Sequence, residues 1–201
     1  LKANPEAVLI PGEELRWYRD QLRARDGGKY ELELQQQIDT IPELHDLPAT
    51  TKAIICIPIA AASEADNIYQ TLSLYAQQEE VTPGETTLLL HVNWVDDALN
   101  DPAKKAAIEK TKAEIERARA SFPDLRIAVV ETEWDKAFMD TQNGIIGHVA
   151  RKMSDIAMLS ATRAIDVGTL SPDQDVLVIR NDADAQGMSR HYLRNMLKNF
   201  E

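Results

Sequence analysis

Four short apolar runs separated by helix-like segments follow residue 52, and this alternation limits the folds that the chain can adopt. Each run is rich in β-branched and aliphatic residues, as strands buried on both faces are. Strands that alternate with helices imply a mostly parallel sheet with right-handed crossovers. We therefore expect an α/β fold with a mostly parallel, Rossmann-like sheet flanked by helices. The runs are AIICIPI (53–59), TTLLLHVN (86–93), LRIAVVET (125–132) and VLVIR (176–180).

Helix signals lie between and after these runs. Asp101 followed by Pro102 is typical of a helix start and predicts a helix over 102–121. Ser63 with Asp66 three residues later resembles a capping box, which predicts a second helix that begins at Ser63 and ends near Gln78. Further helices are expected over 148–165 and after Ser189, with an irregular loop over 133–147.

Residues 1–51 differ from the rest and predict a helical N-terminal extension and linker. Helical periodicity covers 13–25 and 30–39, and Pro42 and Pro48 punctuate the stretch that follows. We expect Trp17 and Tyr18 to pack this extension onto the α/β domain, which spans 52–201.

Composition excludes several classes of protein. The net charge of −11 argues against nucleic acid as a partner, and no apolar run reaches the roughly 18 residues of a membrane span. The single Cys56 cannot form an internal disulfide and reads as a core residue. Without a visible signal peptide, these features predict a cytoplasmic protein. The four histidines show no zinc-site spacing; they are His45, His91, His148 and His191.

Two acids directly after the last apolar run are the strongest functional signal. Asp182 and Asp184 follow VLVIR with one small residue between them. The carboxyl end of a buried strand is where open α/β sheets bind ligands. Two neighbouring carboxylates repel each other unless a cation lies near, and Mg²⁺ or Mn²⁺ prefers such oxygen ligands. Asp is also common in turns for local reasons, so the pair alone leaves a purely structural role open.

Taken in order, the landmarks after residue 52 resemble the nucleotide-binding half of family 2 glycosyltransferases, which have the glycosyltransferase-A fold. The first run ends in a Pro and leads to an Asn-Ile pair, the second is followed by Asn and acids, a Gly-x-x-Ala-Arg segment comes next, and an Asp-X-Asp motif closes the series. These landmarks are Ile57-Pro58, Asn67-Ile68, Asn93 with Asp96 and Asp97, Gly147 to Lys152, and Asp182-Ala183-Asp184.

The resemblance implies a donor, a metal and a set of contacts. The donor would be a nucleoside-diphosphate sugar of UDP or GDP type, and the acceptor a carbohydrate or another hydroxyl compound. Asp184, with Asp182, would ligate Mn²⁺ or Mg²⁺, and Asp182 would also accept a hydrogen bond from ribose or a metal-bound water. The nucleotide-sugar contacts that it implies are Pro58, Ala60, Asn93, Asp96, Arg151 and Asp182.

Structural roles remain open for several of these residues. Asn93 is also a common turn residue at a strand end, Asp96 and Asp97 could cap the loop before Asp101, and Arg151 could be a surface side chain. The sequence also departs from the family. The departures are Ile59 with the AAAS loop in place of an aromatic and an Asn-Glu pair, Lys152 in place of Asn, and Ser154 in place of Gly.

The family's general base comes after the Asp-X-Asp motif, so we expect it beyond Glu201 and expect the domain to continue there. The donor sugar, the stereochemical outcome and the oligomeric state stay open. Two alternatives to a transferase are a non-catalytic module that binds sugar nucleotides and a nucleotidyl- or phosphoryl-transfer enzyme. The latter lacks support because the chain has no Gly-rich phosphate-binding loop, and a phosphatase of haloacid-dehalogenase type carries its Asp-X-Asp after the first strand.

Overall fold

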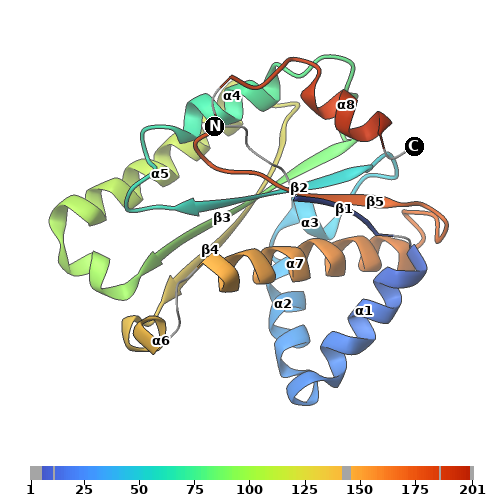
Figure 1. Cartoon of the computed structure of the whole chain (residues 1–201), viewed down its shortest axis with the longest axis horizontal. Helices are drawn as coiled ribbons and strands as arrows, with labels where there is room; N and C mark the ends of the chain where they lie inside the picture. Colours follow the sequence, from blue (N-terminus) through green and yellow to red (C-terminus); the bar gives the residue numbers. More distant parts are fainter. Residues whose placement is uncertain (1–5, 11, 142–145, 186, 200–201) are drawn as a thin grey trace.

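The computed structural model describes residues 6–10, 12–141, 146–185 and 187–199. Five strands form one sheet in the order β1-β5-β2-β3-β4 (Figure 1). The four strands predicted from the sequence pair in parallel, and β1 pairs antiparallel with β5. The expectation of a mostly parallel α/β sheet is confirmed. The strands are β1 (Glu6–Ile10), β2 (Ala53–Ala60), β3 (Thr86–Val95), β4 (Arg126–Trp134) and β5 (Val176–Arg180).

Helices cover both faces of this sheet (Figure 1). On one face lie α4 (Ile68–Ala76), α5 (Pro102–Ser121) and α8 (Tyr192–Lys198). On the other lie α1 (Gly12–Ala24), α2 (Lys29–Asp39), α3 (Pro42–His45) and α7 (Ile146–Asp166). The remaining short helices are η1 (Arg25–Gly28), η2 (Asp96–Asn100) and α6 (Lys136–Thr141).

Side chains of strands β2 to β5 alternate between two hydrophobic cores. In β2, Ile54 and Cys56 pack under α7, whereas Ile55 and Ile57 pack toward α4 and α5. A strand with both faces buried needs apolar residues at every position, which is why these runs are continuous rather than alternating. Burial raises the pKa of the Cys56 thiol to about 12, consistent with a core residue.

Several helix boundaries follow the sequence signals and two do not. Asp101 caps α5 as expected, accepting from the backbone N–H of Ala103 at 2.9 Å. The prediction that a helix begins at Ser63 is wrong: α4 begins at Ile68, and residues 61–63 form a turn. The Ser63 hydroxyl donates to the Ala60 carbonyl at 3.3 Å, so the local hydrogen bond stabilises this turn instead of a helix. Likewise, α8 begins at Tyr192 rather than directly after Ser189.

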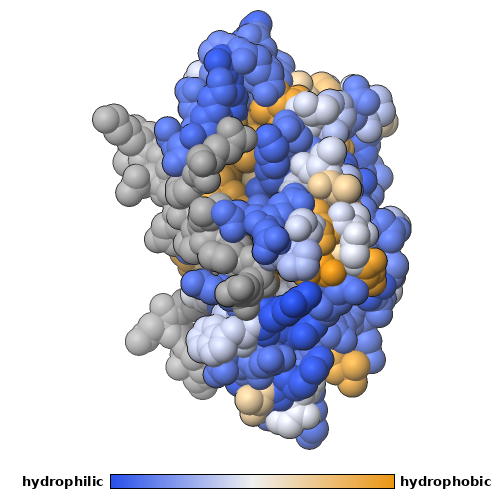
Figure 2. Space-filling model, turned by 90° about the vertical axis from the view of Figure 1, so that its right-hand side faces the viewer, coloured by the Kyte–Doolittle hydropathy of each residue, from blue (hydrophilic) through white to orange (hydrophobic). Residues whose placement is uncertain are grey.

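The predicted loop over 133–147 is partly regular. β4 continues to Trp134, and α6 follows it; Asn143-Gly144 lies outside the described residues. Within the described helices, none has both the length and the apolar character that a membrane span requires. The face seen from the right-hand side of Figure 1 is mostly hydrophilic, with apolar side chains in small separate areas (Figure 2).

The N-terminal extension packs against α7 and also supplies β1, a strand that the sequence analysis did not predict. Tyr18 packs onto the domain as expected, but the prediction for Trp17 is wrong, because this side chain is 63% exposed. The hydroxyls of Tyr18 and Tyr30 both donate to the carboxylate of Asp155, which is fully buried in α7. Burial raises the pKa of Asp155, while the two hydrogen bonds act in the opposite direction.

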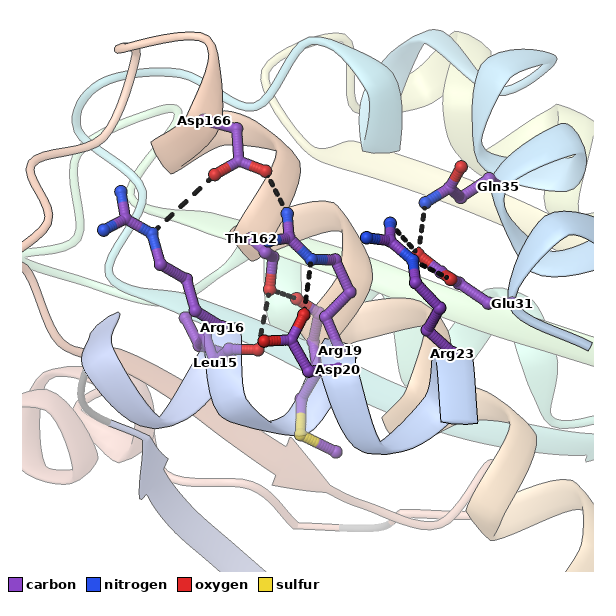
Figure 3. A network of polar contacts seen from close by, with 10 residues as sticks. Leu15, Arg16, Arg19, Asp20, Arg23, Glu31, Gln35, Thr162 and Asp166 are labelled. Carbon is purple, nitrogen blue, oxygen red and sulfur yellow. Dashed lines mark hydrogen bonds and ion pairs between the residues drawn. The ribbon is translucent and has the colours of Figure 1, made fainter. Parts of the chain in front are cut away.

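Ion pairs between α1 and its neighbours α7 and α2 add to this contact (Figure 3). Arg16 and Arg19 both pair with Asp166 at the end of α7. Arg23 makes a two-pronged contact with the buried Glu31 of α2, with both N–O distances at 2.9 Å. The extension is therefore held by buried hydrogen bonds at Asp155 and by charged groups at its rim.

Replacing Tyr30 by Phe tests how strongly the buried carboxylate holds the extension. A hydrogen bond to a charged group contributes about 1.5–3 kcal/mol, so Tyr30→Phe should lower the free energy of unfolding by that amount in urea titrations. Tyr69→Phe is the matched control, because Tyr69 packs its ring on Phe122 at 5.6 Å and should change stability little. Equal effects of the two substitutions would contradict the role of Tyr30.

Candidate functional site

The chain order of the parallel strands creates one switch point in the sheet. After β2 the chain adds β3 and β4 on one side, and it then returns to place β5 on the other side of β2. Ligands of open α/β sheets bind outside the carboxyl ends of the strands at such a switch point. Here the position is bordered by the loop after β2 and by the segment after β5, which contains Asp182 and Asp184.

The segment after β5 is anchored to neighbouring elements by its backbone and by Asn181. The backbone N–H of Asn181 donates to the Cys56 carbonyl at 3.0 Å and so extends the pairing with β2. Its buried amide donates to the hydroxyl of Tyr75 in α4 at 2.6 Å and accepts from the backbone N–H of Asp182 at 3.0 Å. These bonds fix the direction in which the chain leaves the strand.

Ala183 supplies the second anchor. Its side chain is buried between the sheet and α4, and its carbonyl accepts from the hydroxyl of Thr71 at 2.6 Å. The side chains on either side of it, Asp182 and Asp184, are exposed. The arrangement thus presents two carboxylates to solvent on a backbone that helix α4 holds in place.

A third carboxylate, which the sequence analysis did not single out, comes from the loop after β2. Glu64 accepts a hydrogen bond from the backbone N–H of Ala60 at 2.6 Å. Burial raises the pKa of Glu64, the bond from Ala60 lowers it, and the charges of Asp184 and Asp182 raise it again. Glu64 follows β2 and the two aspartates follow β5, so the three acids lie at the carboxyl edge of two neighbouring parallel strands, where their mutual repulsion favours a cation.

The carboxylates at this edge suit a metal ion that is shared with a bound ligand better than one that is enclosed by protein side chains. Among the described residues, no group of three or more His, Cys, Asp or Glu side chains is arranged to hold an ion. Mg²⁺ in enzymes is often bound by only one or two carboxylates, with water and substrate phosphates as its other ligands. The exposed pair Asp182 and Asp184 has the right oxygen donors for an ion shared with a phosphate-bearing ligand, rather than for one enclosed by protein.

Two of the other predicted residues lie near this edge. Pro58 is half-buried within β2, opposite His91 of β3. Ala60 is the last residue of β2 and is exposed, and its N–H is already bound by Glu64. Ala60 therefore borders the switch point, whereas Pro58 lies two residues further back in the strand.

The predicted base and ribose contacts lie within β3 (Asn93) and directly after it (Asp96 and Asp97), and all three have protein partners. The buried amide of Asn93 donates to the carbonyls of Ile59 and His91, at 2.8 and 3.3 Å, and so joins the ends of β2 and β3. Asp96 accepts from the backbone N–H of Lys136 at 3.2 Å, and Asp97 pairs with the ammonium group of Lys136. Asn93 therefore links two strands rather than forming a turn, and Asp96 and Asp97 contact the start of α6 rather than cap the loop before Asp101.

Arg151 lies in the first half of α7, on the face of the sheet opposite α4 and α5. Its side chain is about half exposed, and its Nε lies 3.8 Å from the buried carboxylate of Asp155, beside the N-terminal extension. The structure therefore brings Ala60, Asp182 and Asp184 together at the switch point and places Arg151 in a different environment.

Asp182 and Asp184 lie at an exposed edge of the sheet. Three cavities of about 180, 560 and 330 Å³ occur along the described residues, and neither Asp182 nor Asp184 lines any of these three. No protein-family model matches the sequence, and comparisons with curated proteins and with solved structures found no match. The interpretation of the site consequently depends on its own geometry and on the sequence landmarks.

Proposed function

We propose that this protein binds a nucleoside-diphosphate sugar, of UDP or GDP type, at the carboxyl edge between β2 and β5, and transfers the sugar to an acceptor hydroxyl with the help of Mg²⁺ or Mn²⁺. The observation that carries the proposal is the pair of exposed carboxylates, Asp182 and Asp184, at the switch point of a parallel sheet. The order of the sequence landmarks supports the same assignment.

The positions and hydrogen bonds of the residues at this edge suggest a role for each of them. Asp182 and Asp184 would hold the metal ion, which when bound offsets the charge of the diphosphate and of the leaving group. Thr71 and Tyr75 act as positioning residues, because their hydrogen bonds hold the backbone that carries the two acids. Glu64 keeps the loop after β2 folded back on Ala60, which shapes the other wall of the site.

A thermal-shift screen of UDP- and GDP-sugars with and without Mn²⁺ tests the proposal. A ligand that binds only the native state stabilises it by about 2.7 kcal/mol at 100 times its Kd. We expect a rise in Tm that requires sugar nucleotide and Mn²⁺ together. A rise that is independent of the metal, or none with any sugar nucleotide, would refute the proposed site.

Release of UDP or GDP separates a transferase from a binding module. An enzyme should liberate the nucleotide from the stabilising donor, slowly with water and faster with a suitable acceptor. Binding without any release over many hours would favour the non-catalytic alternative and would leave the assigned binding site intact.

A further inference from the structure

A groove of about 560 Å³ runs beside the outer edge of β4, far from the acids after β5. Within the described part of the chain β4 pairs only with β3, so its other edge has no strand partner. The end of α2 with α3 forms one wall, and α5 forms the other. The lining residues are Gln37, Thr40, Ile41, Pro42, Glu43, Glu116, Arg119, Val129, Val130 and Glu131.

The backbone groups that face this groove can be identified from one hydrogen bond. The guanidinium of Arg119 donates to the Ile127 carbonyl at 2.8 Å, so the backbone of Ile127 points away from β3. The backbone N–H and C=O groups of successive residues in a strand point to opposite edges of that strand. Those of Val129 and Glu131 therefore also point away from β3. Toward the start of β4, the Arg126 guanidinium bonds to the carbonyls of Glu43 and Asp46, which closes that end of the edge.

The two walls of the groove differ in chemistry. The α5 side carries Glu116 and Glu131, whereas the α3 side carries Ile41 and Pro42 next to Glu43. In an added strand, alternate side chains would point to these two walls. The α5 side thus offers two carboxylates, and the α3 side combines apolar side chains with a third carboxylate.

The charge balance favours a basic partner over a second copy of the chain. Glu116 pairs with Arg119 at 2.7 Å, and Glu131 pairs with Lys112 at the rim, also at 2.7 Å. These surface ion pairs contribute little to stability. With Glu43, the groove has three carboxylates and two cations, so its net charge is negative. A second copy with a net charge of −11 would add like charge to this groove.

We propose that the edge of β4 binds an extended segment of a partner protein in which basic and apolar residues alternate, by addition of a strand to the sheet. The main-chain bonds would come from Val129 and Glu131, and the three carboxylates of the groove, which outnumber its cations, would favour the basic positions. This interaction is independent of sugar-nucleotide binding, because β4 is the edge strand at the end of the sheet away from β5.

Peptide binding tests this directly. A fluorescein-labelled peptide that alternates lysine and valine should bind the parent protein in fluorescence anisotropy, and the same peptide with glutamate in place of lysine should not. Amide hydrogen exchange at Val129 and Glu131, measured by NMR, should slow when the lysine peptide is present. Failure of the lysine peptide to bind, or binding without this protection, overturns the proposal.

Two pairs of variants separate strand addition from general attraction to an acidic protein. Val129→Pro removes an outward N–H without removing a bond to β3, so it should weaken binding at least tenfold, whereas Val129→Thr keeps the N–H and should bind like the parent. Glu131→Lys should weaken binding more than Glu14→Lys, which makes the same change of charge on the exposed side of α1.

Circular dichroism first establishes that each variant is folded. If folded Val129→Pro binds like the parent, or if Glu131→Lys and Glu14→Lys weaken binding equally, the peptide is held by the overall charge and the proposal fails. Should Val129→Pro prove unfolded, the comparison of the two lysine variants and the exchange data decide the question on their own.

Discussion

Asp184→Asn should abolish the Mn²⁺-dependent binding of UDP or of a UDP- or GDP-sugar, with a loss of at least a hundredfold in affinity by calorimetry. The substitution removes one of the two exposed carboxylates at the switch point and leaves unchanged the bond from the Asn181 amide to Tyr75 and the bond from Thr71 to the Ala183 carbonyl. It also removes a negative charge beside Glu64, so the pKa of Glu64 should fall and the Tm should not decrease.

Asp175→Asn is the matched control for this experiment. Asp175 is exposed and precedes β5, so it lies at the opposite end of the same strand, and its replacement makes the same change in net charge. This variant should bind as the parent does. If Asp184→Asn binds UDP and Mn²⁺ as tightly as the parent, the assignment of the metal to this pair is wrong.

The second large effect is expected from His91, a buried histidine in the middle of the sheet. Its Nε2 lies 2.8 Å from the hydroxyl of Thr132. Burial, together with the nearby charge of Lys152, lowers the pKa of His91 from 6.5 to about 4. Between these two values the unfolded chain binds a proton that the folded chain does not, so stability must fall as the pH falls through this window.

The expected magnitude is about 3 kcal/mol, since one pKa unit corresponds to about 1.4 kcal/mol. Urea titrations at several pH values should show that the parent loses this much more stability between pH 6.5 and 4 than His91→Gln does. Other titratable groups, such as Asp155, whose pKa burial raises, are present in both proteins and cancel in the comparison.

His191→Gln serves as the control for this pH dependence. The side chain of His191 is 44% exposed, so the variant should keep the acid sensitivity of the parent. Parallel pH profiles for the parent and His91→Gln would show that His91 is solvated in the folded protein.

Much of the regular structure could be predicted because its signals are local. The strand over 176–180 has the bounds that its apolar run predicts, and α5 begins at Pro102 because Asp101 caps it through backbone groups two and three residues away. The location of the acids also followed from sequence, since the carboxyl end of a buried strand in an alternating α/β chain lies at the ligand edge of the sheet.

The contacts in the candidate site were harder to predict, because they join residues that are distant in the sequence. Nothing near Asn93 in the sequence indicates that Ile59 will take its amide hydrogen, and Lys136 lies 40 positions from Asp96. Glu64 could have been proposed as an acid in the loop after the first strand, but its closeness to Asp182 became visible only in the folded chain.

By itself, then, the sequence determined the α/β class, the order of the parallel strands along the chain and the pair of acids after the last strand, because periodicity and capping act over a few neighbouring residues. Only the tertiary structure decided that β1 joins the sheet beside β5, that Tyr18 rather than Trp17 is held by Asp155, and that Arg151 lies beside the buried carboxylate of Asp155. These outcomes depend on burial and hydrogen bonding between segments more than a hundred positions apart in several cases, such as Tyr18 and Asp155 with a separation of 137.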